Sequence, residues 1–249
     1  MSSLHPEYRL KRWHQQMQQI ASHLPHDIPL PVSGRLTRMV GLTLEAEGLF
    51  ASLGSRCRIT QGRQHSEAEV VGFHRDKLYL MPVAEIHGLA PNARVTPLQH
   101  EAQVEVGFEL LGRVIDGAGQ PLDSKPLPTL VHSVPLHGRR INPLNRDPIA
   151  FSLDVGVRAI NSLLTVGRGQ RLGLFAGTGV GKSILLGMMA KYTKADVVVV
   201  GLVGERGREV NEFIRQILGD EGLARSVVVA APADDPPLRR LHGALRATA

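Results

Sequence analysis

Cysteine is nearly absent from the 249 residues: Cys57 is the only one, so the chain has no disulfide framework of its own. This usage suits a reducing cytoplasm. A lone thiol needs a neighbouring base to act in catalysis, and we therefore interpret Cys57 as a small residue of a strand. Aromatic residues are also scarce, at 4%, so stacking platforms for single-stranded nucleic acid are few.

Long apolar runs are missing as well. No segment approaches the length of a membrane span, and residues 1–20 are too polar for a secretory signal. The hydrophobic fraction of 43% and the charged fraction of 21% are typical of a soluble globular protein with room for more than one domain. The net charge of +6 is dispersed along the chain and is only a weak indication of an anionic partner.

The N-terminal segment, residues 1–33, predicts an amphipathic helix over 6–24 and then a Pro-rich linker. Apolar side chains recur at three- and four-residue steps with basic residues beside them. The apolar positions are Leu10, Trp13, Met17, Ile20 and Leu24. Pro25, Pro29 and Pro31 end the helix. Such a helix either packs on its own domain or binds a partner or an acidic membrane surface, and both interpretations stay open.

Residues 34–98 predict the short strands of a small β-barrel domain. Val40, Leu42 and Leu44 alternate with polar neighbours. A hairpin is expected to pair 68–74 with 77–81, and Pro91-Asn92 marks another turn. The barrel sequence contains no constellation of His, Cys or paired carboxylates that indicates a site.

The third part, residues 99–249, begins with a connector rich in Gly and Pro over 101–150 and continues with alternating helix and strand patterns. Helices are expected over 157–166, 183–189 and 209–218, and strands over 171–175, 196–203 and 226–230. This alternation predicts an α/β fold with a parallel sheet covered by helices.

Residues 176–183 read AGTGVGKS between the expected strand 171–175 and the expected helix. Glycines in such a loop let consecutive N–H groups point at phosphate oxygens, and the start of the next helix adds partial positive charge. Lys182 can reach the β- and γ-phosphates of a nucleoside triphosphate, and the Ser183 hydroxyl can ligate Mg²⁺. The predicted nucleotide-binding residues are Ala176, Gly177, Thr178, Gly179, Val180, Gly181, Lys182 and Ser183. Ala176 departs from the motif, which has glycine at its first position.

A second candidate element follows the strand 196–203, where the chain reads GERGRE over 204–209. In open parallel sheets, chemistry gathers at the carboxyl ends of the strands. A carboxylate there can orient or deprotonate the water that attacks the γ-phosphate, and Glu205 is our candidate. The alternative interpretation is the capped, solvated start of a helix.

Over about residues 36–244 the chain resembles the hexameric ATPases of type III export, which are relatives of the catalytic subunit of rotary ATP synthases. The resemblance rests on LLGRVIDGAGQPLD (110–123), VGVRAINSLLTVGRGQRLGLFAGTGVGKS (155–183) and GLVGERGREVNEFI (201–214). Further segments resemble the flagellar members rather than the virulence members: INPLNRDPI (141–149), GVRAIN (156–161), LLGMMAKYTKADVVVVGLVGERGREV (185–210) and SVVVAAPAD (226–234). Asn161 stands where many relatives have Asp, and flagellar members also use Asn.

The resemblance implies a P-loop, RecA-like parallel sheet with helices on both faces, preceded by the barrel and the N-terminal helix. It implies ATP and Mg²⁺ as cofactors, with Lys182 and Ser183 at the phosphates and the metal. Glu205 would be the catalytic carboxylate, and Arg206 and Glu209 would support the site or a subunit interface. The implied activity is ATP hydrolysis that energises flagellar protein export.

The implied partners are five other copies in a homohexamer with the barrels as its crown, export gate and stalk proteins, export substrates and their chaperones. The N-terminal helix would dock a negative regulator and touch the membrane. The implied location is the cytoplasm, at the inner face of the cytoplasmic membrane, with no nucleic acid as partner.

Members of this family continue well beyond position 249, and we expect this chain to lack their C-terminal part. That part would supply the Asp that organises Mg²⁺, an arginine donated across the interface, the adenine pocket and further sheet strands. Without those strands, 197–200 would have an open flank, which favours aggregation. We therefore predict that this chain, isolated, hydrolyses ATP negligibly.

Two other functions are kept as alternatives. An RNA-dependent helicase of the transcription-termination type shares the nucleotide core, but its barrel should carry aromatics that stack bases. Only Phe73 and Tyr79 fall among the barrel strands here. The second alternative is a non-catalytic remnant that keeps only the docking function of the N-terminal helix.

Overall fold

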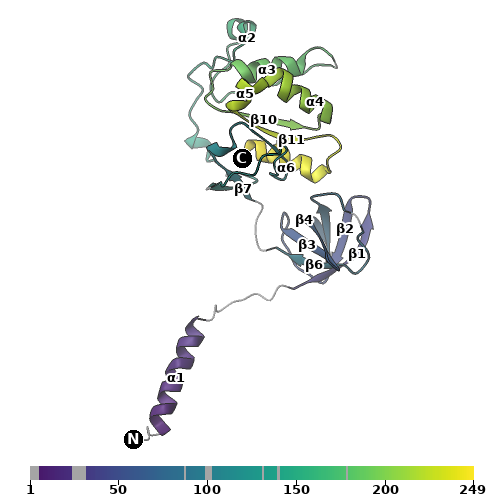
Figure 1. Ribbon diagram of the computed structural model, residues 1–249, viewed down its shortest axis with the longest axis vertical. Coiled ribbons are helices and arrows are strands. Elements are labelled where there is room, and N and C mark those ends of the chain that lie inside the picture. The colour runs from purple at the N-terminus through teal and green to yellow at the C-terminus, as the bar shows by residue number, and fades with distance from the viewer. Residues whose placement is uncertain are drawn as a thin grey trace. The chain divides into compact units, whose positions relative to one another are not determined.

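The structure, a computed structural model, describes residues 6–23, 32–86, 88–98, 103–130, 132–138, 141–177 and 179–249. The chain divides into two compact units, Met1–Val32 and Ser33–Ala249. The first unit contains helix α1, Pro6–His23, which confirms the predicted helix (Figure 1). Leu10, Trp13 and Met17 are exposed on it. The prolines expected to end the helix lie outside the described residues.

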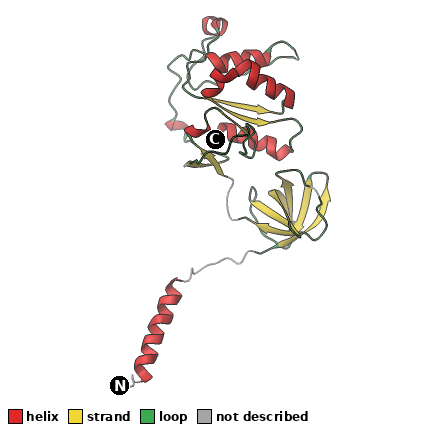
Figure 2. Ribbon diagram, viewed as in Figure 1, coloured by secondary structure: helices red, strands yellow, loops and turns green. Residues whose placement is uncertain are grey.

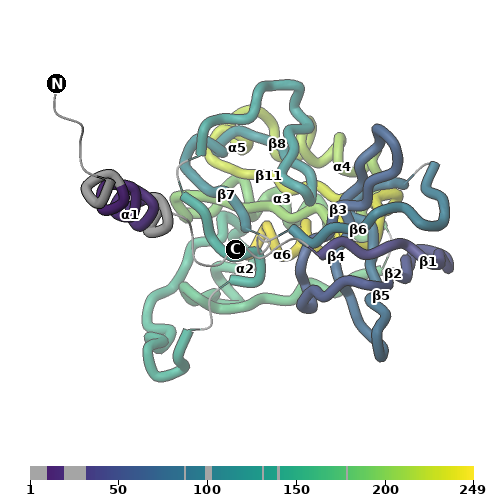
Figure 3. The backbone as a smooth tube through the Cα atoms, turned by 90° about the horizontal axis from the view of Figure 1, so that it is seen from below, coloured from purple at the N-terminus to yellow at the C-terminus, as the bar shows by residue number. Residues whose placement is uncertain are grey.

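The second unit begins with a closed six-stranded barrel, as predicted. Its strands are β1 Gly34–Val40, β2 Thr43–Glu47, β3 Arg56–Gln61, β4 Gln64–His74, β5 Lys77–Pro82 and β6 Arg94–Pro97. They pair in the order β1-β2-β5-β4-β3-β6, and antiparallel pairing of β1 with β6 closes the barrel. Figure 3 shows these strands wrapped around a common interior.

The barrel interior is apolar because alternate strand residues point inward. Its fully buried residues include Leu44, Ile59, Val70, Leu80 and Val95. Cys57 lies among them on β3, as expected for a small strand residue, and burial raises the pKa of its thiol to about 11.

Two turns of the barrel lie where the sequence predicts them. The expected hairpin is confirmed: β4 and β5 pair antiparallel, and Arg75 in the turn between them adopts a left-handed φ of 56°. Asn92 also adopts a left-handed φ, 69°, at the predicted Pro91-Asn92 turn. The alternating pattern misleads at Val40 and Leu42, which are half exposed at the end of β1 and in the tight turn that joins β1 to β2.

The rest of the second unit is an α/β layer around a parallel sheet. β10, Val198–Val203, pairs with β11, Ser226–Ala231, and β11 pairs with β8, Arg113–Asp116. Strand β8 lies inside the region that the sequence indicated as a connector. Only Val114 and Ile115 are apolar in this four-residue strand, so its pattern is too short to recognise.

Helices cover both faces of this sheet, as expected (Figures 1 and 2). On one face lie α3 Lys182–Tyr192, α4 Gly207–Glu212, the π-helical segment η3 Phe213–Leu218 and α5 Gly219–Ala224. Apolar side chains of α3, η3 and α5 pack with Val114 and Val228 of the sheet. On the other face, α6 Pro237–Thr248 packs on β10 and β11.

Smaller elements complete the second unit. They are a two-stranded ribbon of β7 Gln103–Val106 and β9 His132–Pro135, the short 3₁₀ turns η1 Phe108–Leu110 and η2 Pro143–Asn145, and helix α2 Arg158–Leu163. Helix α2 is shorter than the predicted 157–166. The predicted helix 209–218 is instead α4 continued by η3.

The strand predicted over 171–175 is not formed. Leu172 and Phe175 are exposed at 49% and 95%, and no strand of the described chain pairs with this segment. The sheet ends at β10, whose outer edge is unpaired within the described residues, so 171–175 has no neighbouring strand for its backbone groups. The expected open flank of β10 is confirmed, because Val197 and Val199 are 38% and 51% exposed.

Within the described residues, no helix combines the length and the apolar character that a membrane crossing requires.

Candidate functional site

The glycine loop, residues 176–181, directly precedes α3. It has the backbone conformation that phosphate binding needs. Gly179 and Gly181 adopt left-handed φ angles of 79° and 90°, which glycine tolerates best. Space is open beside Gly177, Gly179 and Gly181, where a Cβ would contact no heavy atom of the described residues within 4 Å. Thr178, one of the predicted binding residues, lies outside the described residues.

The start of α3 is open to an anion. Gly181 is its N-cap, and among the residues that the structure describes no side chain accepts a hydrogen bond from the first turn. The first turn also contains no acidic residue. Its unsatisfied N–H groups therefore remain available, and they carry the positive end of the helix dipole.

Lys182 and Ser183 are the first two residues of this helix, so both side chains start directly beside the glycine loop. Ala176, Val180 and Ser183 are exposed, and Lys182 is half-buried. An ammonium, a hydroxyl and free backbone N–H groups converge on one loop, which is the set of groups that binds a phosphate chain.

Glu205 is held at the carboxyl end of β10 by backbone hydrogen bonds to the end of β11. Gly204 N donates to Ala231 O at 2.8 Å, and Ala233 N donates to Glu205 O at 2.9 Å. The Glu205 carboxylate is partly buried and has no hydrogen bond or ion pair with any residue that the structure describes. A fixed backbone with an uncommitted carboxylate suits a group that acts on a bound water.

Arg206 is the N-cap of α4, and its guanidinium lies 3.5 Å from the Glu209 carboxylate. The Arg206 side chain is 77% exposed. The structure therefore places Arg206 in a helix-start ion pair, beside the candidate base and directed to Glu209.

The topology brings the glycine loop and Glu205 to the same end of the sheet, where the parallel strands have their carboxyl ends. Helix α3 leads directly into β10, so the chain runs along α3 and returns along the strand. The start of α3, with Lys182, therefore lies toward the carboxyl end of β10, which Glu205 follows. No hydrogen bond or ion pair joins Lys182, Ser183 and Glu205 in the described part of the chain.

A Mg²⁺ ion fits this site only together with a nucleotide. The described residues contain no group of three His, Cys, Asp or Glu side chains that could hold a metal. Ser183 is the one predicted ligand. Mg²⁺ in nucleotide sites takes one or two protein ligands and completes its shell with phosphate oxygens and water, so one hydroxyl beside an open glycine loop fits that chemistry.

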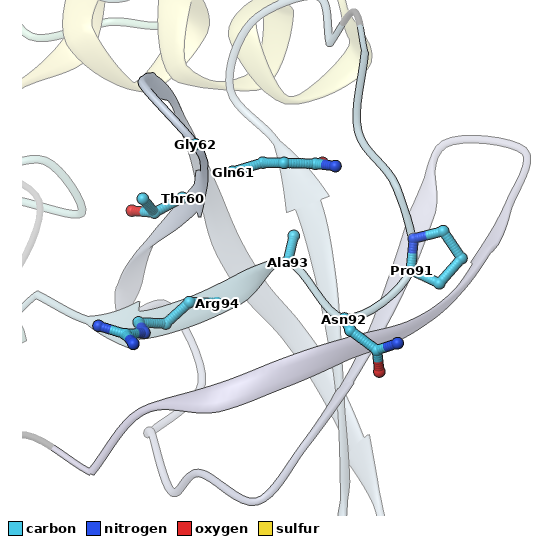
Figure 4. Close-up of a pocket in the computed structure, with 7 residues that line it drawn as sticks. All are labelled: Thr60, Gln61, Gly62, Pro91, Asn92, Ala93 and Arg94. Atoms are coloured by element: carbon cyan, nitrogen blue, oxygen red, sulfur yellow. The ribbon is translucent and has the colours of Figure 1, made fainter.

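A cavity of the barrel lies elsewhere and has a different character. It measures about 460 Å³ and is lined by Thr60, Gln61, Gly62, Pro91, Asn92, Ala93 and Arg94 (Figure 4). The Gln61 side chain already accepts a hydrogen bond from Ala90 N at 2.6 Å. Because the Gln61 side chain is used by the barrel's own loop and the described lining includes no carboxylate, this cavity does not compete with the glycine loop as the candidate site.

The glycine loop lies in a part of the chain that matches known nucleotide-binding domains. Residues 156–249 match the family described as "ATP synthase alpha/beta family, nucleotide-binding domain". The flagellum-specific ATP synthase of Pseudomonas aeruginosa is 63% identical over 217 residues, which are 86% of this chain and 48% of that protein. This chain is a homologue of the flagellum-specific ATP synthases. That of Salmonella typhimurium is 57% identical over 226 residues, covering 86% of this chain and 50% of the relative.

Proteins named for type III secretion also match the chain. The type 3 secretion system ATPase of Xanthomonas euvesicatoria is 45% identical over 218 residues, 87% of this chain and 49% of its own length. The assembled ATPase EscN of the enteropathogenic E. coli type III secretion system superposes with a TM-score of 0.79 at 38% identity. The match covers 86% of this chain and 52% of EscN. The chain thus spans about half the length of the relatives it matches.

Proposed function

We propose that this chain binds Mg²⁺-ATP at residues 176–183 and provides this site to an ATPase that energises flagellar protein export. The observation that carries the proposal is the open glycine loop at the uncapped start of α3. Its relatives are named for the flagellum and for type 3 secretion, which favours export over the RNA helicase alternative.

Each candidate residue has a distinct task in hydrolysis. The N–H groups of the loop and the Lys182 ammonium hold the phosphate chain and neutralise charge on the β- and γ-phosphates. The Ser183 hydroxyl holds Mg²⁺, which when bound draws negative charge from the phosphate oxygens. The Glu205 carboxylate orients the attacking water and accepts its proton, and Arg206 keeps Glu209 paired at the start of α4.

The wider proposal concerns the assembly. EscN was solved as an assembled ATPase and in a complex with its central stalk EscO. By homology we assign this protein to a homohexamer with a stalk protein. We further propose that it acts at the inner face of the cytoplasmic membrane. Helix α1, with its exposed apolar side chains, is assigned to a regulator, and export substrates and chaperones complete the partners.

The binding half of the proposal is tested by titrating the 249-residue chain with a fluorescent ATP analogue and Mg²⁺. Lys182→Ala should weaken binding by about tenfold or more, because a charge-assisted contact contributes roughly 1.5–3 kcal/mol. Lys191→Ala, at the other end of the same helix, is the matched control and should bind as the parent does. Equal affinity of the parent and Lys182→Ala would refute the assignment of the site.

The catalytic half needs the protein in its native assembly, purified from flagellated cells. Glu205→Gln should retain nucleotide binding and suppress phosphate release, since the amide keeps the shape but cannot accept a proton. Glu212→Gln, an exposed change on the following helix, should leave phosphate release unchanged. Parallel loss of binding and turnover in Glu205→Gln would mean that Glu205 is structural.

A further inference from the structure

A short connection, residues 193–197, joins the two elements that carry the candidate site. Helix α3 begins at Lys182 and ends at Tyr192, and β10 begins at Val198 and leads to Glu205. The placement of this connection sets the position of one element relative to the other. The structure holds the connection from two sides.

On one side, the backbone carbonyl of Asp154 accepts two hydrogen bonds from the connection. Thr193 Oγ1 donates at 3.1 Å and Lys194 N at 2.9 Å. Gly156, two residues after Asp154, lies close against Tyr192 at the end of α3, because a Cβ at Gly156 would collide with Tyr192. Gly156 also has a left-handed φ of 76°, so this close approach depends on glycine.

Asn161 of α2 keeps Asp154 in that position. Its Nδ2 donates to Asp154 Oδ1 at 2.6 Å, and its Oδ1 accepts from Val155 N at 3.1 Å. Gly156 N also donates to Asp154 Oδ1, at 2.8 Å. An amide can donate and accept in this way, whereas a carboxylate can only accept. Hydrogen bonds from Gly156 N and Asn161 lower the pKa of Asp154, and the charge of Lys194 lowers it further.

On the other side, Arg225 holds the carbonyls of the same connection. Its Nη2 donates to Thr193 O at 2.9 Å and also to Ala195 O. Its own carbonyl accepts from Val198 N at 3.1 Å, at the start of β10. One guanidinium thus satisfies carbonyls that follow the last turn of α3, where a cation also complements the helix dipole.

We propose that Asp154, Asn161 and Arg225 are positioning residues that hold the α3–β10 connection and thereby set Lys182 and Ser183 relative to Glu205. None of the three is assigned a contact with the nucleotide. This inference rests on the proposed function of the glycine loop.

The test uses Asn161→Asp, which keeps size and acceptor but places a second carboxylate against Asp154. At pH 8 the two charges repel, and affinity for the fluorescent Mg²⁺-ATP analogue should fall about fivefold, the equivalent of one hydrogen bond. At pH 4.5 two facing carboxyls share a proton, so the substituted side chain donates again and the affinity relative to the parent should recover. Asn145→Asp, an exposed site that adds the same charge, should match the parent at both pH values.

A second readout follows the connection itself. The hydrogen-exchange protection factor of the Lys194 amide should fall in Asn161→Asp at pH 8 and recover at pH 4.5. Arg225→Lys, which keeps the charge and loses the fork of donors, should lower both protection and affinity at either pH.

The outcomes separate the two proposals. Faster exchange with parental nucleotide affinity would overturn the positioning role and leave the proposed function intact. Unchanged exchange and affinity would also overturn the positioning role. A parent that does not bind the analogue would refute the proposed function, and the positioning role would fall with it. Loss that persists at pH 4.5 would show that the Asn161–Asp154 hydrogen bond is not the cause.

Discussion

Nε2 of His242 lies 2.8 Å from Oε2 of Glu69, which joins helix α6 to barrel strand β4. Both residues are buried, with exposed fractions of 1% and 7%. The ring is not aligned to donate a hydrogen bond, so the contact is an ion pair when the imidazole is protonated. A buried carboxylate is costly unless it is paired, and His242 is the partner that the structure provides for Glu69.

The first prediction concerns this pair. His242→Ala leaves the Glu69 carboxylate buried beside a cavity, and the free energy of unfolding should fall by about 3 kcal/mol, measured by urea denaturation. Glu67→Gln on the same strand is the control, because Glu67 is 42% exposed and pairs with Arg56 at 3.4 Å. That change should cost less than about 1 kcal/mol. Equal losses in the two variants would mean that the buried contact adds nothing.

The second prediction uses Cys57 as a probe of the barrel. Its thiol is fully buried and burial raises its pKa to about 11, so access and thiolate formation are both suppressed. The folded chain should not react with a thiol reagent at pH 8, and labelling should follow barrel unfolding as urea is added. Stoichiometric labelling within seconds in the absence of urea would show that the barrel opens locally around β3.

Local patterns explain what could be predicted from the sequence. The glycine loop could be predicted because all of its functional residues lie in eight consecutive positions. The turns at 75–76 and 91–92 could be predicted because they contain residue types that favour turns. Cys57 could be placed because a single thiol in an alternating segment has one simple interpretation.

Features that depend on distant partners could not be predicted. Strand β8 has two apolar residues, and its place in the sheet is decided by β11, which lies far along the chain. The segment 171–175 has a strand pattern, but a strand forms only beside another strand, and the described chain offers none there. The His242–Glu69 pair has no signal at all, since neither residue stands in a motif.

The third prediction concerns the packing of α3 on η3. A Cβ added to Gly187 would collide with the side chain of Ile217. Gly187→Ala should therefore lower the free energy of unfolding by roughly 1–3 kcal/mol, although alanine is the better helix former. Urea denaturation measures the loss.

Two further variants test that explanation. At Gly207 in α4, a Cβ would meet no heavy atom within 4 Å in the described part of the chain, so Gly207→Ala should be neutral or stabilising. In an Ile217→Ala background the collision is removed, and Gly187→Ala should then cost nothing. If the cost persists in that background, overpacking against Ile217 is the wrong cause.

The fourth prediction is a pH dependence that arises from Asp123. Its two oxygens accept from Arg113 Nε at 2.6 Å and Nη2 at 2.9 Å, and they also accept from Val114 N and Lys125 N. The Arg113 guanidinium, followed by these N–H groups, holds the pKa of Asp123 far below its usual value. The folded state therefore binds this proton less readily than the unfolded chain, whose Asp pKa is about 3.9.

Because the folded pKa is lowered, the contribution of Asp123 is fully present above about pH 5 and is lost as the pH falls toward the folded pKa. The parent should exceed Asp123→Asn in free energy of unfolding by a constant amount between pH 5 and 7, and the gap should narrow at pH 4 and again at pH 3. Urea denaturation at these pH values measures it, with the exposed change Asp220→Asn as control. A gap of the same size at every pH would mean that the Asp123 side chain stabilises β8 by its shape and neutral hydrogen bonds rather than by its charge.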